Sequence, residues 1–145
     1  MALMPRVSQA HLDARRRQIL DAARRCFVRN GFHQTSIQDI LTESGLSAGA
    51  MYRYFRSKDD IVQGLAAETL DQLMTAFDVA TSTPKPLADA LGEIARTFER
   101  LDEELDLARM VVQIWGEAMR SPELAERFGR LASVLRGRMA GVVAT

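Results

Sequence analysis

The chain has 145 residues, of which 47% are hydrophobic, so it can build a packed core and is not a disordered tail. Its formal net charge is zero, but residues 1–65 carry 10 Lys and Arg against 6 Asp and Glu, whereas residues 66–145 carry 9 against 13. A basic front half and an acidic back half favour one surface that faces phosphate and another that faces away from it.

Cys26 is the single cysteine, so no internal disulfide can form and an oxidising compartment is not indicated. It falls on an apolar helix stripe, where a buried small side chain is the simpler interpretation and a redox sensor is the alternative. No stretch approaches the roughly 18 consecutive apolar residues of a membrane span. The N-terminus also lacks the apolar segment of a signal peptide. We therefore expect a cytoplasmic protein without membrane contacts.

The first predicted elements are an N-terminal arm and a long helix. Residues 1–10 are expected to form a flexible arm, and a helix is predicted over 12–29. Its apolar residues recur at steps of three and four and so share one helix face: Ile19, Ala22, Ala23, Cys26 and Phe27. Asn30-Gly31 ends this helix, because glycine accepts the left-handed conformation that follows a helix end.

Two short helices with a tight turn between them are predicted next. The first starts at Thr35, which offers a capping box with Gln38, and it ends at Gly45. The second is capped by Ser47 and ends near Phe55, and its apolar residues Met51 and Phe55 are expected to pack in the core rather than contact DNA.

The rest of the chain is predicted to be helical apart from one linker. Ser57 and Asp60 cap a long fourth helix, which a proline-containing linker at 81–86 follows. Two runs of apolar residues with the helical period follow, and Ser121-Pro122 starts the last helix. The first run is Leu87, Leu91, Ile94, Phe98 and Leu101, and the second is Val111, Ile114, Trp115, Ala118 and Met119. No strand pattern is found, so we predict an all-α fold of seven helices.

Residues 35–55 have the layout of a helix-turn-helix, in which one helix braces against the DNA backbone and a second enters the major groove. Small residues let the start of the second helix approach a phosphate: Ser47, Ala48, Gly49 and Ala50. Arg53 has the side chain that pairs with guanine, with a solvated position as the alternative. Tyr52, Tyr54 and Lys58 offer groups that bind phosphate oxygens, and packing is the alternative for Tyr52.

The segment from residue 19 to about residue 65 resembles the TetR family of transcriptional regulators. The matching positions follow the family's order across four helices: Ile19-Leu20-Asp21-Ala22-Ala23, Phe27, Asn30-Gly31-Phe32, Thr35-Ser36-Ile37, Ile40, Gly45-Leu46-Ser47, Gly49, Met51-Tyr52, Tyr54-Phe55 and Ser57-Lys58. The resemblance implies a three-helix DNA-binding domain at 11–65. A long fourth helix would join it to a helical effector-binding and dimerisation domain at 66–145, which is expected to be incomplete.

The resemblance also implies which residues contact DNA. The expected contacts are Thr35, Ser36, Ser47, Ala48, Gly49, Ala50, Tyr52, Arg53, Tyr54 and Lys58. Thr35 and Ser36 would bind phosphate at the start of the bracing helix. The family often has lysine where Ala48 stands and threonine where Ala50 stands, and these departures change the operator sequence without changing the fold.

The function implied is repression of transcription by a homodimer that binds a palindromic double-stranded DNA operator. A small-molecule effector bound in the C-terminal domain would release it. The side chains expected nearest an effector pocket are Phe98, Met110, Ile114, Trp115 and Met119, with plain core packing as the alternative. A second hypothesis is an interaction module that pairs with a full-length relative and has no competent operator binding of its own.

The pattern does not favour an enzyme. The two histidines, His11 and His33, have no Cys or carboxylate partner at the spacing of metal ligands. The chain also lacks a phosphate-cradling glycine loop and a nucleophile elbow. We therefore expect no catalytic residues, no metal site and no cofactor.

Overall fold

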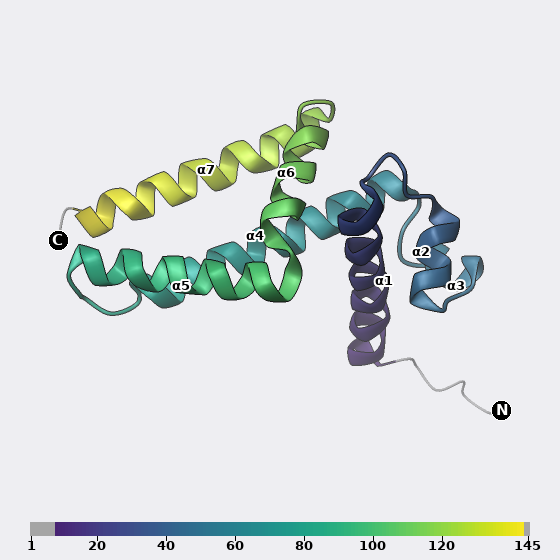
Figure 1. Cartoon of the computed structure of the whole chain (residues 1–145), viewed down its shortest axis with the longest axis horizontal. Coiled ribbons are helices and arrows are strands. Elements are labelled where there is room, and N and C mark those ends of the chain that lie inside the picture. Colours follow the sequence, from purple (N-terminus) through teal and green to yellow (C-terminus); the bar gives the residue numbers. More distant parts are fainter. Residues whose placement is uncertain (1–7, 144–145) are drawn as a thin grey trace. The chain divides into compact units, whose positions relative to one another are not determined.

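The computed structural model describes residues 8–143 and contains seven helices over that range (Figure 1). They are α1 (Gln9–Asn30), α2 (Ile37–Ser44), α3 (Ala48–Tyr52), α4 (Lys58–Thr81), α5 (Leu87–Leu105), α6 (Leu107–Ala118) and α7 (Pro122–Val143). Residues 8–143 include no strand, and the prediction of an all-α fold is confirmed.

The chain forms two compact units, one that ends at Val62 and one that begins at Gln63. Helix α4 runs through this division, so its first turn belongs to the first unit and the rest belongs to the second.

The core of the first unit is built from one face of α1 against α2, α3 and the start of α4. The apolar stripe predicted for the first helix is buried, and Ile19 and Cys26 have no exposed surface. The other fully or almost fully buried side chains of this core are Phe27, Ile40, Met51, Phe55 and Ile61. The ring of Phe27 packs edge-on against that of Phe32, with centroids 5.4 Å apart. Burying such side chains contributes about 1.5–3 kcal/mol each, which fixes the positions of the short helices.

Helix α1 begins earlier than the sequence predicted. Ser8 is its N-cap, and the Ser8 hydroxyl accepts a hydrogen bond from the backbone N–H of His11 at 3.2 Å. Residues 8–10 were expected in a flexible arm, but this cap satisfies a free donor of the first turn and extends the helix. Residues 1–7 of that arm lie outside the described part of the chain.

The capping box of α2 lies one residue later than predicted, so the Thr35–Gln38 box is wrong. Ser36 is the N-cap: its hydroxyl accepts from the N–H of Asp39 at 3.1 Å, and the Asp39 carboxylate accepts from the N–H of Ser36 at 2.8 Å. Helix α2 therefore starts at Ile37. It ends at Gly45, where a φ of 72° confirms the predicted left-handed stop.

Helix α3 is shorter than predicted. Ser47 caps it, with its hydroxyl accepting from the N–H of Ala50 at 3.2 Å, but regular helix ends at Tyr52 rather than near Phe55. The carbonyl of Met51 accepts from the N–H groups of both Tyr54 and Phe55, which closes a compact final turn. The predicted cap of α4 is confirmed, since the Ser57 hydroxyl accepts from the N–H of Asp60 at 3.1 Å.

In the second unit, Asp106 separates the two helices that the apolar runs over 87–101 and 111–119 predicted. Its φ of 50° is left-handed, and α5 ends there while α6 begins at the next residue. The Asp102 carboxylate accepts from the N–H of Ala108 at 2.8 Å and so steadies the start of α6. The predicted cap of α7 is present, with the Ser121 hydroxyl accepting from the N–H of Leu124 at 3.4 Å.

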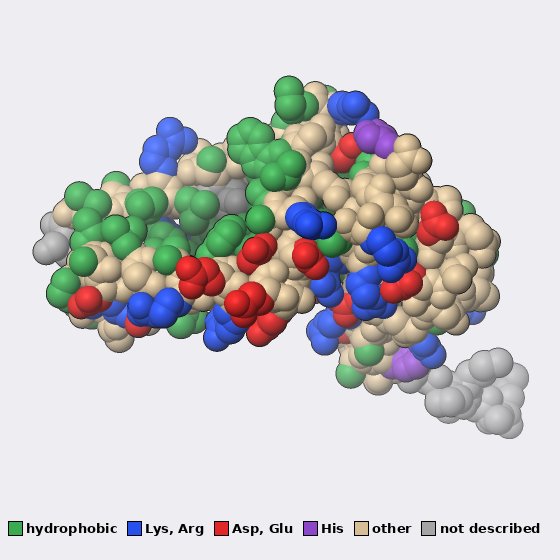
Figure 2. Space-filling view, viewed as in Figure 1, with side chains coloured by type: hydrophobic (Ala, Val, Ile, Leu, Met, Phe, Trp, Pro, Cys, Tyr) green, Lys and Arg blue, Asp and Glu red, His purple; other side chains and the backbone are tan. Residues whose placement is uncertain are grey.

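Helices α5 to α7 expose many large apolar side chains. Leu87, Leu91 and Phe98 belong to the stripe predicted to face a core, yet each is more than 40% exposed. The other exposed large apolar residues of these helices are Val112, Trp115, Met119, Val134, Met139 and Val143. Figure 2 shows hydrophobic side chains gathered over this unit. Across the described helices none is both long enough and apolar enough to cross a bilayer.

Candidate nucleic-acid interface

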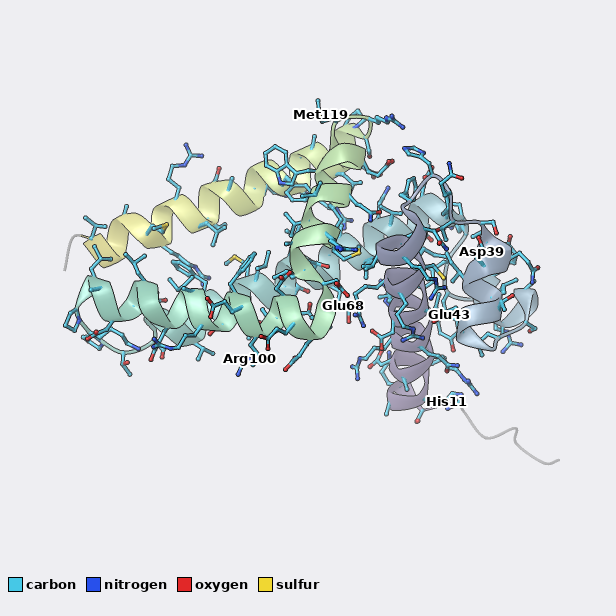
Figure 3. The ribbon with its side chains drawn as sticks, viewed as in Figure 1. His11, Asp39, Glu43, Glu68, Arg100 and Met119 are labelled. Atoms are coloured by element: carbon cyan, nitrogen blue, oxygen red, sulfur yellow. The ribbon has the colours of Figure 1, made fainter. Side chains whose placement is uncertain are left out.

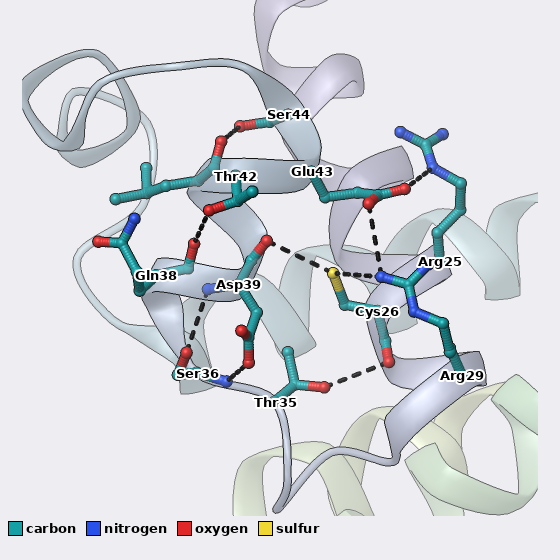
Figure 4. A network of polar contacts seen from close by, with 11 residues as sticks. Arg25, Cys26, Arg29, Thr35, Ser36, Gln38, Asp39, Thr42, Glu43 and Ser44 are labelled. Carbon is teal, nitrogen blue, oxygen red and sulfur yellow. Dashed lines mark hydrogen bonds and ion pairs between the residues drawn. The ribbon is translucent and has the colours of Figure 1, made fainter.

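Helix α2 is tied to α1 by a carboxylate clamp (Figure 4). The Glu43 carboxylate on α2 accepts from Arg25 Nε at 2.8 Å and lies 3.4 Å from Arg29 Nη2, both on α1. The arginine side chains are about half exposed, so the charge attraction itself is modest. The pairing nevertheless fixes which face of α2 turns toward α1, and Figure 3 shows Glu43 on that side.

A second tie holds the turn between α2 and α3. Gln18 Nε2 on α1 donates to the backbone carbonyl of Ser44 at 2.8 Å, and Arg15 donates to Gln18 Oε1 at 3.0 Å. The Ser44 hydroxyl in turn accepts from the N–H of Leu46 at 3.3 Å. The last carbonyls of a helix have no partner within it, so this relay satisfies one of them and places the turn.

Hydrogen bonds and burial shift three titratable groups here. The hydrogen bond from Arg25 holds the pKa of Glu43 below its ordinary value of 4.5. The backbone N–H and then the hydroxyl of Ser36 lower the pKa of Asp39. Burial raises the pKa of the Cys26 thiol, which favours the neutral buried side chain over the redox interpretation.

Helix α3 has one buried face and one exposed face. Met51 and Phe55 are almost completely buried, as the sequence predicted. The exposed face carries Ser47, Ala48, Gly49, Tyr52 and Arg53, with Ala50 and Tyr54 half-buried beside them. The Tyr52 side chain is 52% exposed, so its hydroxyl is not committed to the core. The structure therefore brings the small residues, one tyrosine and one arginine together on a single outer surface.

The cations of the first unit divide into paired and exposed groups. Arg24, Arg25 and Arg29 have carboxylate partners within the unit. The guanidinium of Arg16 lies 4.7 Å from the ring centre of Phe55, immediately after α3. Arg17, Arg53 and Arg56 are exposed, and no ion pair joins them to the described carboxylates. These four exposed arginines hold the positive charge that remains available to phosphate.

Thr35 and Ser36, both predicted to bind phosphate, lie in different environments. Thr35 is 1% exposed, and its hydroxyl donates toward the carbonyls of Cys26 at 3.2 Å and Gly31 at 2.8 Å. Its side chain is thus committed to the end of α1 and does not reach the surface. Ser36 is exposed at the start of α2.

Lys58, predicted to bind the DNA backbone, has its ammonium group against the protein. Its Nζ donates to the carbonyls of Phe32 at 2.9 Å and Thr35 at 3.0 Å. The same atom lies 4.3 Å from the centre of the Phe32 ring.

The sequence did not identify the residues that hold α2 and the following turn against α1. Gln18 and Glu43 belong to no local motif, because their partners lie 26 and 18 residues away in the sequence and only the fold brings them close. The sequence shows that Glu43 and Arg25 carry opposite charges. It does not show that they pair, because the geometry of the loop between α1 and α2 decides which faces of the two helices meet.

The five residues predicted nearest an effector pocket differ in exposure. Met110 and Ile114 are buried, whereas Phe98, Trp115 and Met119 are exposed. Met119, the C-cap of α6, is labelled in Figure 3. Its side chain is 86% exposed. A cavity of about 640 Å³ is lined by other residues: Val79, Ala80, Thr83, Lys85, Glu93, Arg96, Thr97 and Arg100. The burial of Met110 and Ile114 fits the core-packing alternative, and an effector pocket at the five residues stays a prediction.

Metal ligands are not clustered in residues 8–143: that range holds no group of three or more His, Cys, Asp or Glu side chains placed to bind an ion. His11 lies in the first turn of α1 (Figure 3).

Residues 19–65 match the family model of the bacterial regulatory proteins of the tetR family. The chain is 32% identical over 139 residues to the HTH-type transcriptional repressor Rv1474c of Mycobacterium tuberculosis, and the match covers 94% of this chain and 70% of the repressor. These values extend the likeness beyond the helix-turn-helix into the second unit.

Solved structures show the same fold. A TetR family transcription regulator from Marinobacter aquaeolei VT8 matches with a TM-score of 0.79 at 26% identity, covering 94% of this chain and 73% of that one. Salmonella enterica GusR matches with a TM-score of 0.68 at 32% identity, covering 86% of this chain and 62% of GusR. The chain therefore spans between about three fifths and three quarters of the length of these proteins.

Proposed function

Because the chain belongs to the TetR family of bacterial regulatory proteins, we propose that it represses transcription by reading a palindromic DNA operator through α3. It is a DNA-binding regulator and not an enzyme, because its family is one of transcription regulators. The observation that carries the proposal for the site is the exposed face of α3, where small residues, Tyr52 and Arg53 surround a helix whose opposite face is locked into the core.

In this proposal the start of α3 enters the major groove. Side chains as small as Ala48 and Gly49 let the backbone come close to the base edges, and the methyl group of Ala50 can contact a thymine methyl. Arg53 pairs with a guanine or an adjacent phosphate, and Tyr52 donates its hydroxyl to a phosphate oxygen. The proposed contact set is Ser36, Ser47, Ala48, Gly49, Ala50, Tyr52, Arg53 and Tyr54.

Two residues of the original set act differently in this proposal. Thr35 stays in the interior and supports Ser36 from behind, because its hydroxyl is already bonded to α1. The role of Lys58 is argued separately below.

Release from the operator requires a coupling between the two units. An effector that binds the second unit lowers operator affinity only as far as it prefers the released conformation.

The experiment is fluorescence anisotropy at physiological salt, with duplex DNA from upstream of the gene and a shuffled duplex of equal length. We expect preferential binding to the first duplex. Arg53→Ala and Tyr52→Ala should each weaken binding by about 1–3 kcal/mol with little change in thermal stability, because both side chains are exposed. Arg109→Ala, which removes an exposed arginine of the second unit, is the matched control and should bind like the wild type. Wild-type binding by both α3 variants would show that the reading face is assigned incorrectly.

A second candidate function is an interaction module that pairs with a longer relative. The exposed apolar side chains of α5 to α7 favour it, since large exposed apolar areas mark protein contacts. A size measurement on a mixture with such a relative tests it, and the absence of a mixed complex would exclude it.

A further inference from the structure

Lys58 lies where the first turn of α4 meets the loop between α1 and α2. An ammonium group has three donors and no acceptor. Two of the three are directed to the carbonyls of Phe32 and Thr35, and the aromatic face of Phe32 lies within cation–π distance. The side chain is half-buried rather than extended into solvent.

The loop that Lys58 holds leads directly into α2. Residues 31–35 contain no regular helix, so their carbonyls are not paired by the ladder of a helix. The hydroxyl of Thr35 anchors the loop to α1. The ammonium group of Lys58 anchors the loop to α4 by donating to the carbonyl of Thr35. Ser36, the N-cap of α2, follows immediately. The start of α2 is therefore positioned by two contacts of Thr35, one from its hydroxyl to α1 and one from its carbonyl to Lys58 on α4.

We propose that Lys58 is a positioning residue, whose ammonium group fastens the loop before α2 to the start of α4 and so orients the helix-turn-helix, rather than a phosphate contact. This inference rests on the proposed DNA-binding function. It departs from the role that the family resemblance implied for this lysine, because two of its three donors are already bonded to loop carbonyls in the protein without DNA.

The two roles predict different behaviour of the free protein. The chain has two lysines, Lys58 and Lys85, so amine acylation followed by mass spectrometry resolves each one. A positioning lysine is engaged without DNA, and we expect Lys58 to react about tenfold more slowly in the folded protein than in urea-unfolded protein. The added duplex should slow it further by less than about twofold. A lysine that reacts at the unfolded rate and becomes protected only by DNA would overturn the inference.

The two roles also differ in salt dependence. Removing a phosphate contact lowers the slope of log affinity against log salt by about 1, because one fewer counterion is released. We expect Lys58→Met to weaken operator binding about tenfold at every salt concentration while the slope stays unchanged. Arg53→Ala provides the comparison, since loss of an exposed cation should reduce the slope. A slope reduced by about 1 in Lys58→Met would assign the lysine to phosphate.

The design separates the failure of this inference from the failure of the proposed function. If the wild type shows no preference for the upstream duplex, the operator proposal fails, yet acylation of the free protein still tests the contact of Lys58. If Lys58→Met does not fold, Lys58→Gln is measured in its place, and the acylation of wild-type protein decides the matter in any case.

Discussion

Two adjacent hydroxyl groups, on Thr35 and Ser36, do different work because one is buried and the other exposed. Thr35 bonds carbonyls at the end of α1, whereas Ser36 caps α2. A buried carbonyl that loses its donor keeps the cost of its desolvation, while an exposed group regains water. For each hydrogen bond lost, deleting the hydroxyl of Thr35 should therefore lower the free energy of unfolding more than deleting that of Ser36.

We predict that Thr35→Val lowers the free energy of unfolding by about 1–3 kcal/mol, because it leaves the carbonyls of Cys26 and Gly31 without this donor while keeping the shape of the side chain. Urea unfolding at neutral pH measures the loss. Thr35→Ser keeps the hydroxyl and removes one methyl group, and it should recover most of the hydrogen-bond contribution. If Thr35→Val were as stable as the wild type, the interior role of this hydroxyl would be refuted.

At the scale of elements, the clamp between α1 and α2 has a pH dependence with a definite sign. The pKa of Glu43 in the folded protein lies below its ordinary value of 4.5, chiefly because of the hydrogen bond from Arg25. The clamp therefore contributes stability above pH 4.5, and this contribution is lost as the pH falls through the lowered pKa. Cys26, which lies beside the clamp, stays neutral through this range because burial raises its pKa.

We predict that Glu43→Gln is less stable than the wild type at pH 7 and that the difference narrows steadily below pH 4.5. Urea unfolding of both proteins at several values between pH 7 and pH 3 tests this. Asp39, whose pKa is also lowered, is present in both proteins, so its titration cancels in the difference. Curves that stay parallel across this range would mean that the clamp does not stabilise the fold.

How far the elements could be predicted from the sequence depended on how local their signals are. Gly45, Ser47 and Ser57 act on backbone groups within four residues, and their caps and stops are as predicted. The start of α2 was misplaced because Thr35–Gln38 and Ser36–Asp39 both fit the same motif. Contact with α1, which no local pattern contains, buries Thr35 and leaves Ser36 as the cap.

For the candidate site too, local signals could be predicted from the sequence and contacts between distant segments could not. Met51 and Phe55 were expected in the core of α3 from their helical spacing, and they are buried there. The direction of a long flexible side chain is not encoded in spacing, so the turn of Lys58 toward two loop carbonyls could not be predicted. The pocket residues stay a prediction for a related reason: an apolar stripe on a helix identifies one face of that helix but not what covers the face.

At the scale of the whole molecule, charge and apolar surface are divided between the halves of the chain. The front half carries a net charge of +4 and the back half a net charge of −4, so phosphate is attracted to the first unit alone. The second unit instead exposes apolar side chains on α5, α6 and α7. Such a division suits a protein that binds DNA through one unit and another protein surface through the other.

We predict that two copies of the chain bind one palindromic operator and that the half-site alone binds far more weakly. Losing one of two reading helices removes about half of the roughly 4–10 kcal/mol that separates specific from non-specific binding. Light scattering on the purified chain and its DNA complex measures the number of copies, and anisotropy compares the full duplex with a half-site duplex of equal length. Because the exposed apolar residues lie in the second unit, the dimer should persist at high salt, where DNA binding is lost. A single copy that binds both duplexes equally would contradict the dimer and would favour the module that depends on a longer partner.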